Sequence, residues 1–264
     1  MSVQNYYARR SARSRRQVDL DLVLKLVRLE RREQTRIGTR KLCVLIAPEL
    51  KAAGVKVGRD RLFTILRRAG LLVAKKHAPW PKTTQIDPNL PLFKNLIKRR
   101  KLSGPNQVWV ADITYIRTLE AFVFLALITD LWSHKIVGYH VGQTLETVIV
   151  LKAMAMAVKG LKGCARPIHH SDRGCQYASH AFVKAAKAAG LRLSMTQHRH
   201  SAENAVAERL NGILKQEYGL DETFEDCAEV RLTGKQAVLL YNTRRPHTTL
   251  GMVTPEAVHN ARTN

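Results

Sequence analysis

The spacing of apolar residues predicts that the first part of the chain is helical. Apolar side chains recur every three or four positions in three stretches, residues 22–29, 42–50 and 62–69. Asp19 lies just before the first stretch and is a candidate helix cap. Residues 17–74 are therefore expected to form a small all-helical domain.

Two glycines, Gly54 and Gly58, separate the second and third stretches. Short helices joined by such a turn are typical of a helix-turn-helix, whose last helix can enter the major groove of DNA. A plain helical hairpin with a charged outer face would show the same pattern, so both interpretations stay open. The candidate DNA-binding residues of the last helix are Arg59, Arg61, Arg67 and Arg68.

The pattern changes after a predicted linker over residues 75–103, which begins with four prolines in residues 75–91 and no period. Apolar, β-branched and aromatic runs of strand length then follow. Three strands joined by hairpins precede a helix, a strand, a helix, a strand and a last helix. This order predicts an α/β fold, in which a mixed five-stranded sheet carries helices on its faces.

The net charge of the chain predicts its binding partner. The formal net charge is +23, and residues 1–101 hold 26 Lys and Arg against 7 Asp and Glu. Such a polycation attracts phosphate backbones, so nucleic acid is the expected partner. Residues 1–16 are rich in arginine without a period and are predicted to be a flexible basic arm.

Cysteine usage and hydropathy bear on location. The four cysteines are too widely spaced for a paired-cysteine metal site and too few to cross-link a secreted domain of this size. No apolar run reaches membrane-spanning length, and the N-terminus lacks the apolar segment of a signal peptide. The sequence therefore predicts a soluble intracellular protein with no membrane partner.

Two aspartates lie where strands are predicted. Asp112 interrupts the apolar run VWVADITYI, and a carboxylate buried there is costly unless it is paired, hydrogen-bonded or bound to a metal. Asp172 follows the strand RPIHH, so it is expected at the rim of the sheet, facing a cleft. Asp172 could instead cap the helix that begins near His180, or pair with Arg173.

A third carboxylate, Glu208, lies on the last predicted helix. At about 100° per residue it shares a polar face with Asn204, Asn211 and Lys215, whereas the apolar residues lie on the opposite side. A surface helix would show the same division. His169 and His170 could suggest zinc, but no second pair of ligands completes a set, which favours a structural role.

Three converging carboxylates would repel each other by roughly 4 kcal/mol per close pair at an effective dielectric constant of 20. Divalent cations with hard oxygen ligands, such as Mg²⁺ or Mn²⁺, remove this repulsion. A pair of such ions is suited to phosphoryl transfer. In a basic protein, this indicates chemistry on a polynucleotide.

The stretches VWVADITYI, IHHSDRGCQY and ENAVAERLNGILKQEYG, with 35 residues between Asp172 and Glu208, resemble the Asp, Asp, Glu signature of the retroviral-integrase superfamily. More narrowly, the chain resembles the second-frame transposase of the bacterial insertion-sequence three family. RIGTRKL and GRDRLFTILRRAGLL match its helix-turn-helix region, and YNTRRPHTTLGMVTPEAV matches its C-terminal tail. The resemblance covers almost the whole chain.

This resemblance implies an RNase H-like catalytic core over residues 104–220 and a helical tail over 221–264 that packs on it. It implies that Asp112, Asp172 and Glu208 are catalytic and bind two Mg²⁺ ions, for which Mn²⁺ can substitute. Similar residues in the family suggest DNA contacts, and the corresponding residues here are Arg173, Asn204 and Lys215. For Arg173 a role in strand-end structure, and for Lys215 a solvated surface position, are equally open.

The implied activity is cleavage and transfer of DNA strands at the terminal inverted repeats of an insertion sequence. The implied setting is the bacterial cytoplasm at the nucleoid, with a homo-oligomer on DNA and a first-frame protein as a possible fusion partner. Residues 199–201 depart from the flexible turn common in the family, which predicts a stiffer loop over the site.

Two other functions use the same features. A structure-selective nuclease on this fold would need the same carboxylates but would only hydrolyse DNA. A non-catalytic regulator of the element would need only residues 1–101, and the carboxylate trio argues against it.

Overall fold

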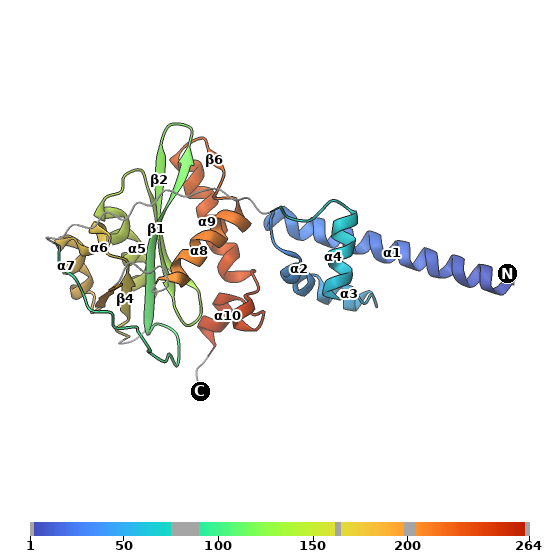
Figure 1. Cartoon of the computed structure of the whole chain (residues 1–264), viewed down its shortest axis with the longest axis horizontal. Helices are drawn as coiled ribbons and strands as arrows, with labels where there is room; N and C mark the ends of the chain where they lie inside the picture. The colour runs from blue at the N-terminus through green and yellow to red at the C-terminus, as the bar shows by residue number, and fades with distance from the viewer. Residues whose placement is uncertain (1–2, 75–89, 162–164, 198–203, 262–264) are drawn as a thin grey trace.

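The computed structural model describes residues 3–74, 90–161, 165–197 and 204–261, and it leaves the side chains of residues 12–18 undescribed. Figure 1 shows an N-terminal group of helices beside a larger domain built on a sheet. The predicted loop at 199–201 lies outside the described residues.

The N-terminal domain packs four helices around a core of leucine, isoleucine and valine side chains. They are α1 (Val3–Glu33), α2 (Thr39–Leu45), α3 (Ala47–Ala52) and α4 (Arg59–Arg68). The single helix predicted over residues 42–50 is two helices, because Pro48 begins a new first turn directly after Ile46. The turn before α4 contains Gly54 in the left-handed conformation, at φ 71°.

The prediction that residues 1–16 form a flexible arm is wrong. These residues are helical from Val3, and the candidate cap Asp19 lies inside α1. No glycine or proline occurs in residues 1–33, and arginine is a good helix former. An apolar period shows that one face of a helix is buried, and a helix without such a face has no period. The missing period in this segment was therefore wrongly interpreted as a missing helix.

The larger domain is built on a mixed sheet with the strand order β3-β2-β1-β4-β5 and a short extra strand paired with β1. The strands are β1 (Val108–Thr118), β2 (Phe122–Asp130), β3 (Ile136–Gly142), β4 (Ile168–Ser171), β5 (Arg192–Met195) and β6 (Thr223–Phe224). The first three are antiparallel neighbours, whereas β4 and β5 continue the sheet in parallel with β1. The predicted α/β fold is confirmed, and the sixth strand was missed because two residues carry no periodic signal.

Helices cover both faces of this sheet. One face carries α5 (Thr147–Lys159), α6 (Cys175–Ala178) and α7 (His180–Ala188), and the other carries α8 (Ala205–Tyr218) and α9 (Cys227–Thr243). Close approach of α5 to β3 depends on Gly138, where an added Cβ would lie 2.2 Å from the backbone oxygen of Ala153. The result is a three-layer arrangement with β1 and β4 at its centre (Figure 1).

The last turn of α9 and the chain after it, which ends in α10 (Pro255–Asn260), pack on the antiparallel edge of the sheet. The side-chain amide of Asn242 accepts from the backbone N–H of Ile136 and donates to its carbonyl, both at 2.9 Å. The His247 ring stacks on His134 with 4.7 Å between centroids. The tail motif thus packs against the core, as the sequence suggested.

Only part of the predicted linker is described, and that part is not a free linker. Residues 90–103 have no regular secondary structure, yet Leu90 and Phe93 pack against one core cluster, and Leu96, Ile97 and Leu102 pack against another. Their packing could not be predicted because it depends on contacts with segments far along the chain, such as β5 and α8.

Candidate active site

Asp112 lies in the middle of β1 and is partly exposed. Its carboxylate Oδ2 accepts a hydrogen bond of 2.8 Å from the side-chain amide of Asn211 on α8. Burial, followed by the charge of Asp172, raises the pKa of Asp112 to about 7. The carboxylate is therefore held in place by one amide while its ionised form is disfavoured.

Asp172 directly follows β4 at the rim of the sheet, as predicted. Because β4 lies beside β1 and parallel to it, Asp172 is delivered to the same side as Asp112. Its Oδ1 accepts the backbone N–H of Gly174 at 3.0 Å, which closes a tight turn. The alternative cap of α7 belongs to Ser179, whose hydroxyl accepts from the N–H of Phe182.

Glu208 lies in the first turn of α8 and is exposed. Burial and the charge of Asp172 raise the pKa of Glu208, and Glu208 in turn contributes to the raised pKa of Asp112. The three predicted carboxylates are thus close enough to act on one another. Within the described part of the chain, however, no group of three or more His, Cys, Asp or Glu side chains is arranged to hold a metal ion.

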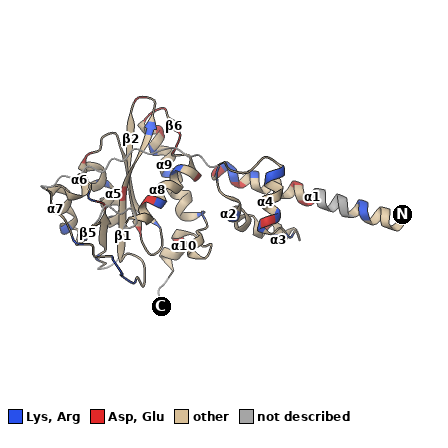
Figure 2. Cartoon of the chain, viewed as in Figure 1, with Lys and Arg blue, Asp and Glu red and all other residues tan. Residues whose placement is uncertain are grey.

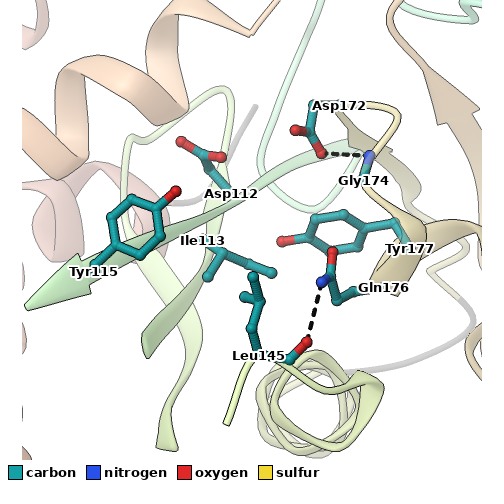
Figure 3. A pocket seen from close by; sticks show the side chains of 8 residues that line it. All are labelled: Asp112, Ile113, Tyr115, Leu145, Asp172, Gly174, Gln176 and Tyr177. Atoms are coloured by element: carbon teal, nitrogen blue, oxygen red, sulfur yellow. Dashed lines mark hydrogen bonds between the residues drawn. The ribbon is translucent and has the colours of Figure 1, made fainter. Parts of the chain in front are cut away.

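A pocket opens between β1 and the turn after β4 (Figure 3). Asp112 and Asp172 line it together with Tyr115, Tyr177 and Gln176, whereas Glu208 does not. Figure 3 shows the two tyrosine hydroxyls directed toward the space beside Asp112. Both hydroxyls are buried and have no hydrogen-bond partner among the described residues. Sequence reasoning missed these tyrosines, although each lies within five residues of a candidate aspartate.

The polar face of α8 is buried at Asn204, Asn211 and Lys215, whereas Glu208 on the same face is exposed. Asn204 is 4% exposed and donates to the carbonyl of Ala111 at 3.1 Å, which fastens the start of α8 to β1. Lys215 is 5% exposed, and burial lowers the pKa of Lys215 to about 8 even though the charges of Asp112 and Asp221 oppose this. Asn204 therefore has a structural bond, and Lys215 is not a solvated lysine, while the DNA contacts of both residues stay predictions.

The remaining predicted DNA-contacting residues are the four arginines of α4 and Arg173. The four arginines of α4 are all exposed, while Arg59 pairs with the neighbouring Asp60 at 2.8 Å. Arg173 donates to the carbonyl of Thr196 at 2.7 Å and so joins the turn after β4 to the end of β5. The structure supports strand-end structure as the role of Arg173.

The two histidines of β4 are structural. His169 is fully buried against Tyr177 and Phe182, and burial lowers the pKa of His169 to about 3. His170 shares a hydrogen bond of 2.9 Å with the hydroxyl of Ser194 on β5.

Replacing Asp112 tests the electrostatics of this site. A carboxyl group whose pKa rises on folding favours the folded state below its unfolded pKa, and this contribution is lost as pH rises through the folded pKa. In the metal-free protein we therefore expect Asp112→Asn to be more stable than the parent at pH 8, by about 2 kcal/mol. Urea unfolding in a chelator should show this gain shrinking between pH 8 and pH 5. A gain that does not change with pH would contradict the raised pKa, and Glu120→Gln is the control at an exposed carboxylate.

Comparison with known proteins first identifies the class of protein to which the larger domain belongs. The family model described as the integrase core domain matches residues 103–201, and a second model with the same description matches residues 189–255. A chain of the simian T-cell lymphotropic virus intasome has the same fold, with a TM-score of 0.53 at 17% identity over 86% of this chain and 72% of that chain. The larger domain is an integrase-type, RNase H-like core.

Proteins with similar sequences identify the family within this class. The chain is 35% identical to an insertion element IS600 31 kDa protein of Shigella sonnei, over 90% of this chain and 86% of that protein. It is 32% identical to the InsF transposase of insertion sequence IS3A of Escherichia coli, over 87% of this chain and 78% of that protein. The chain belongs to the IS3 family of insertion-sequence transposases, so the predicted resemblance is confirmed. This membership supports a role in DNA transposition as a polynucleotidyl transferase. No helix in the described ranges is long and apolar enough to span a membrane.

Proposed function

We propose that this protein cleaves DNA at the ends of an insertion sequence and joins the freed 3′-ends to target DNA, with Asp112, Asp172 and Glu208 as its catalytic residues. The observation that carries the proposal is that Asp112 and Asp172 line one pocket from neighbouring parallel strands, with Glu208 on α8 close enough for the charge of Asp172 to raise its pKa. In a basic chain of this family, carboxylates that disfavour each other's ionised form are suited to binding cations that in turn bind phosphate.

The donor set fits Mg²⁺ or Mn²⁺. Carboxylate oxygens are the ligands these ions prefer, and a bound cation would offset the burial and the charge of Asp172 that raise the pKa of Asp112. Asp112 and Asp172 would hold the ions together with Glu208. When bound, two such ions activate the attacking oxygen and stabilise the leaving oxygen of the phosphodiester.

The neighbouring side chains keep the carboxylates in place for this chemistry. Asn211 fixes one oxygen of Asp112, and the N–H of Gly174 fixes one oxygen of Asp172. The bond from Asn204 to β1 sets the position of the first turn of α8, on which Glu208 lies. Fixed ligands lower the cost of bringing the reacting groups together.

DNA would be bound by the N-terminal domain through the exposed arginines of α4, with the protein acting as a homo-oligomer on paired ends. The terminal repeats and the target are both double-stranded DNA. The nucleoid of the bacterial cytoplasm is the corresponding location. The first-frame fusion partner stays a prediction.

The experiment that tests the proposal is strand cleavage and joining on labelled duplexes that carry the ends of the element, with Mg²⁺, with Mn²⁺ and with a chelator. We expect joined products only with a metal. Hydrolysis without joining would instead identify a nuclease, and tight binding of end DNA without chemistry under either metal would identify a regulator.

A further inference from the structure

A turn that precedes the sheet carries the densest positive charge of the larger domain. Lys98, Arg99, Arg100 and Lys101 follow one another, and all four side chains are exposed. Figure 2 shows this blue stretch on the loop that leads into β1. Among the described residues no ion pair to any of the four is found. We call residues 98–101 the cationic turn.

Hydrogen bonds hold the backbone before and after the cationic turn, and the bond before it reaches the core. Before it, the backbone N–H of Leu96 donates to the hydroxyl of Ser194 on β5 at 2.9 Å, and the side chain of Asn95 accepts from the N–H groups of Ile97 and Lys98. After it, Ser103 and Gln107 exchange hydrogen bonds, from the N–H of Ser103 and from the side-chain amide of Gln107. The four charges are therefore displayed from an anchored backbone, which lowers the entropy lost when a ligand binds.

The backbone at Arg99 adds a second observation. Arg99 has φ 60°, in the left-handed region where glycine or asparagine fits without strain. The turn is closed by a hydrogen bond of 3.0 Å from the N–H of Arg100 to the carbonyl of Ile97. A long cation thus occupies a turn position that favours a small residue, and strained positions of this kind occur at ligand-binding segments.

The turn also lies on the side of the sheet that carries the catalytic helix. Leu96, Ile97 and Leu102, which flank the cationic turn, pack in one apolar cluster with Ala207 of α8. Ala207 is the neighbour of Glu208 in sequence. A ligand bound along the turn would therefore lie on the face of the domain from which α8 presents Glu208.

We propose that the cationic turn is a second DNA-binding site, which holds the phosphate backbone of double-stranded DNA on the catalytic domain independently of α4. This inference rests on the proposed function, because it takes DNA as the ligand of the turn. Consecutive lysines and arginines without an acidic partner release counterions from a phosphate backbone, and they read no base sequence. The site would act on target DNA or on the flank of an element end, whatever its sequence.

The test is the salt dependence of binding to a labelled random-sequence duplex. The variant carries Lys98→Gln, Arg99→Asn, Arg100→Gln and Lys101→Gln, with asparagine chosen because it tolerates the left-handed backbone. The control carries Lys152→Gln, Lys159→Gln, Lys184→Gln and Lys187→Gln, four exposed lysines of α5 and α7 on the opposite face of the sheet. Both variants lose the same net charge, and thermal unfolding establishes that both are folded.

If the turn contacts three or four phosphates, its loss should lower the slope of log affinity against log salt by about 3 and weaken binding about 10- to 100-fold at 0.1 M salt. The control should change both quantities far less. Equal losses in the two variants would show an effect of net charge alone, and an unchanged turn variant would show that the turn does not contact DNA; either result overturns the proposal. A parent protein that binds DNA but performs no strand chemistry would contradict the proposed function while leaving this comparison valid.

Discussion

Asp172→Asn and Glu208→Gln should each reduce metal-dependent strand joining by about 1000-fold or more, the loss typical when a group that acts at the reacting centre is removed. Both substitutions keep the size of the side chain and remove the charge that would hold a divalent cation. Cleavage and joining should fall together, because both steps attack a phosphodiester at the same carboxylates. The measurement is the initial rate of product formation on labelled end DNA in Mg²⁺.

The control for this loss is Glu120→Gln, at an exposed carboxylate in the turn between β1 and β2. It should join DNA at the rate of the parent. Binding of end DNA should be retained by both catalytic variants, since the arginines of α4 are untouched. If Glu208→Gln kept full activity while Asp172→Asn lost it, the assignment of Glu208 would be wrong and the pocket of Asp112 and Asp172 would have to recruit another ligand.

Glu217→Gln should lower the free energy of unfolding by about 3 kcal/mol, because it leaves two partly buried cations without their counter-ion. Glu217 lies near the end of α8 and accepts two hydrogen bonds from Arg245 at 2.8 and 2.9 Å. It also pairs at 2.6 Å with Lys41 of the N-terminal domain. The side chain of Arg245 is only 3% exposed, so water cannot replace the lost charge. Urea unfolding at pH 7 measures the difference.

The pH dependence of this effect has a definite sign. Burial opposes ionisation of Glu217, but the hydrogen bonds and charges of Arg245 and Lys41 outweigh it and lower the pKa of Glu217. A carboxylate with a lowered pKa stabilises the fold above its unfolded pKa and loses this contribution as pH falls through the folded value. The difference between parent and variant should therefore shrink below about pH 4.5.

A matched control lies five residues further along the chain. Glu222 also pairs with a cation of the N-terminal domain, Arg36, but the side chain of Glu222 is 55% exposed. Glu222→Gln should cost less than about 1 kcal/mol, as exposed pairs usually do. Equal costs at Glu217 and Glu222 would argue against burial as the source of the large effect.

These contacts connect the two domains through the helix that carries Glu208. Besides Lys41, the N-terminal domain reaches α8 and the segment after it through Gln34, which accepts from the hydroxyl of Tyr218 at 3.2 Å, and through Arg36, which pairs with Asp221 at 2.6 Å. Arg244 after α9 pairs with Glu30 at 3.0 Å and Glu33 at 2.8 Å of α1. The helical domain thus contacts the end of α8 opposite to Glu208.

The two candidate catalytic aspartates could be found from the sequence because each breaks a local pattern. Asp112 is a charge within an apolar strand, and Asp172 follows a buried strand at a turn. That the two lie together was decided by the structure, in which β1 and β4 are parallel neighbours and present both side chains to the same side of the sheet. Glu208 was recognisable only through the motif it shares with the integrase superfamily, because amphipathic spacing alone fits a surface helix equally well.

The surroundings of the candidate catalytic residues could not be predicted, because they depend on contacts between segments that are distant in the sequence. Asn211 and Asn204 read as members of a polar surface stripe, yet both are buried because α8 packs between β1 and α9. The conformation of residues 3–16 and the strand β6 were likewise missed, since neither has the apolar period on which prediction relies. The packing of residues 90–103 was missed because its partners lie on β5 and α8, far along the chain.

By itself the sequence determined the α/β core, its strand and helix order, the positive charge, and the carboxylates through their motifs, because these depend on local spacing and composition. Only the tertiary structure decided which polar groups are buried, which cations face water and which acidic residues they meet. The link from Lys41 through Glu217 to Arg245 joins residues 41, 217 and 245 across both domains. Such pairings are set by the packing of whole elements, and burial then fixes their energy through desolvation, which no local pattern records.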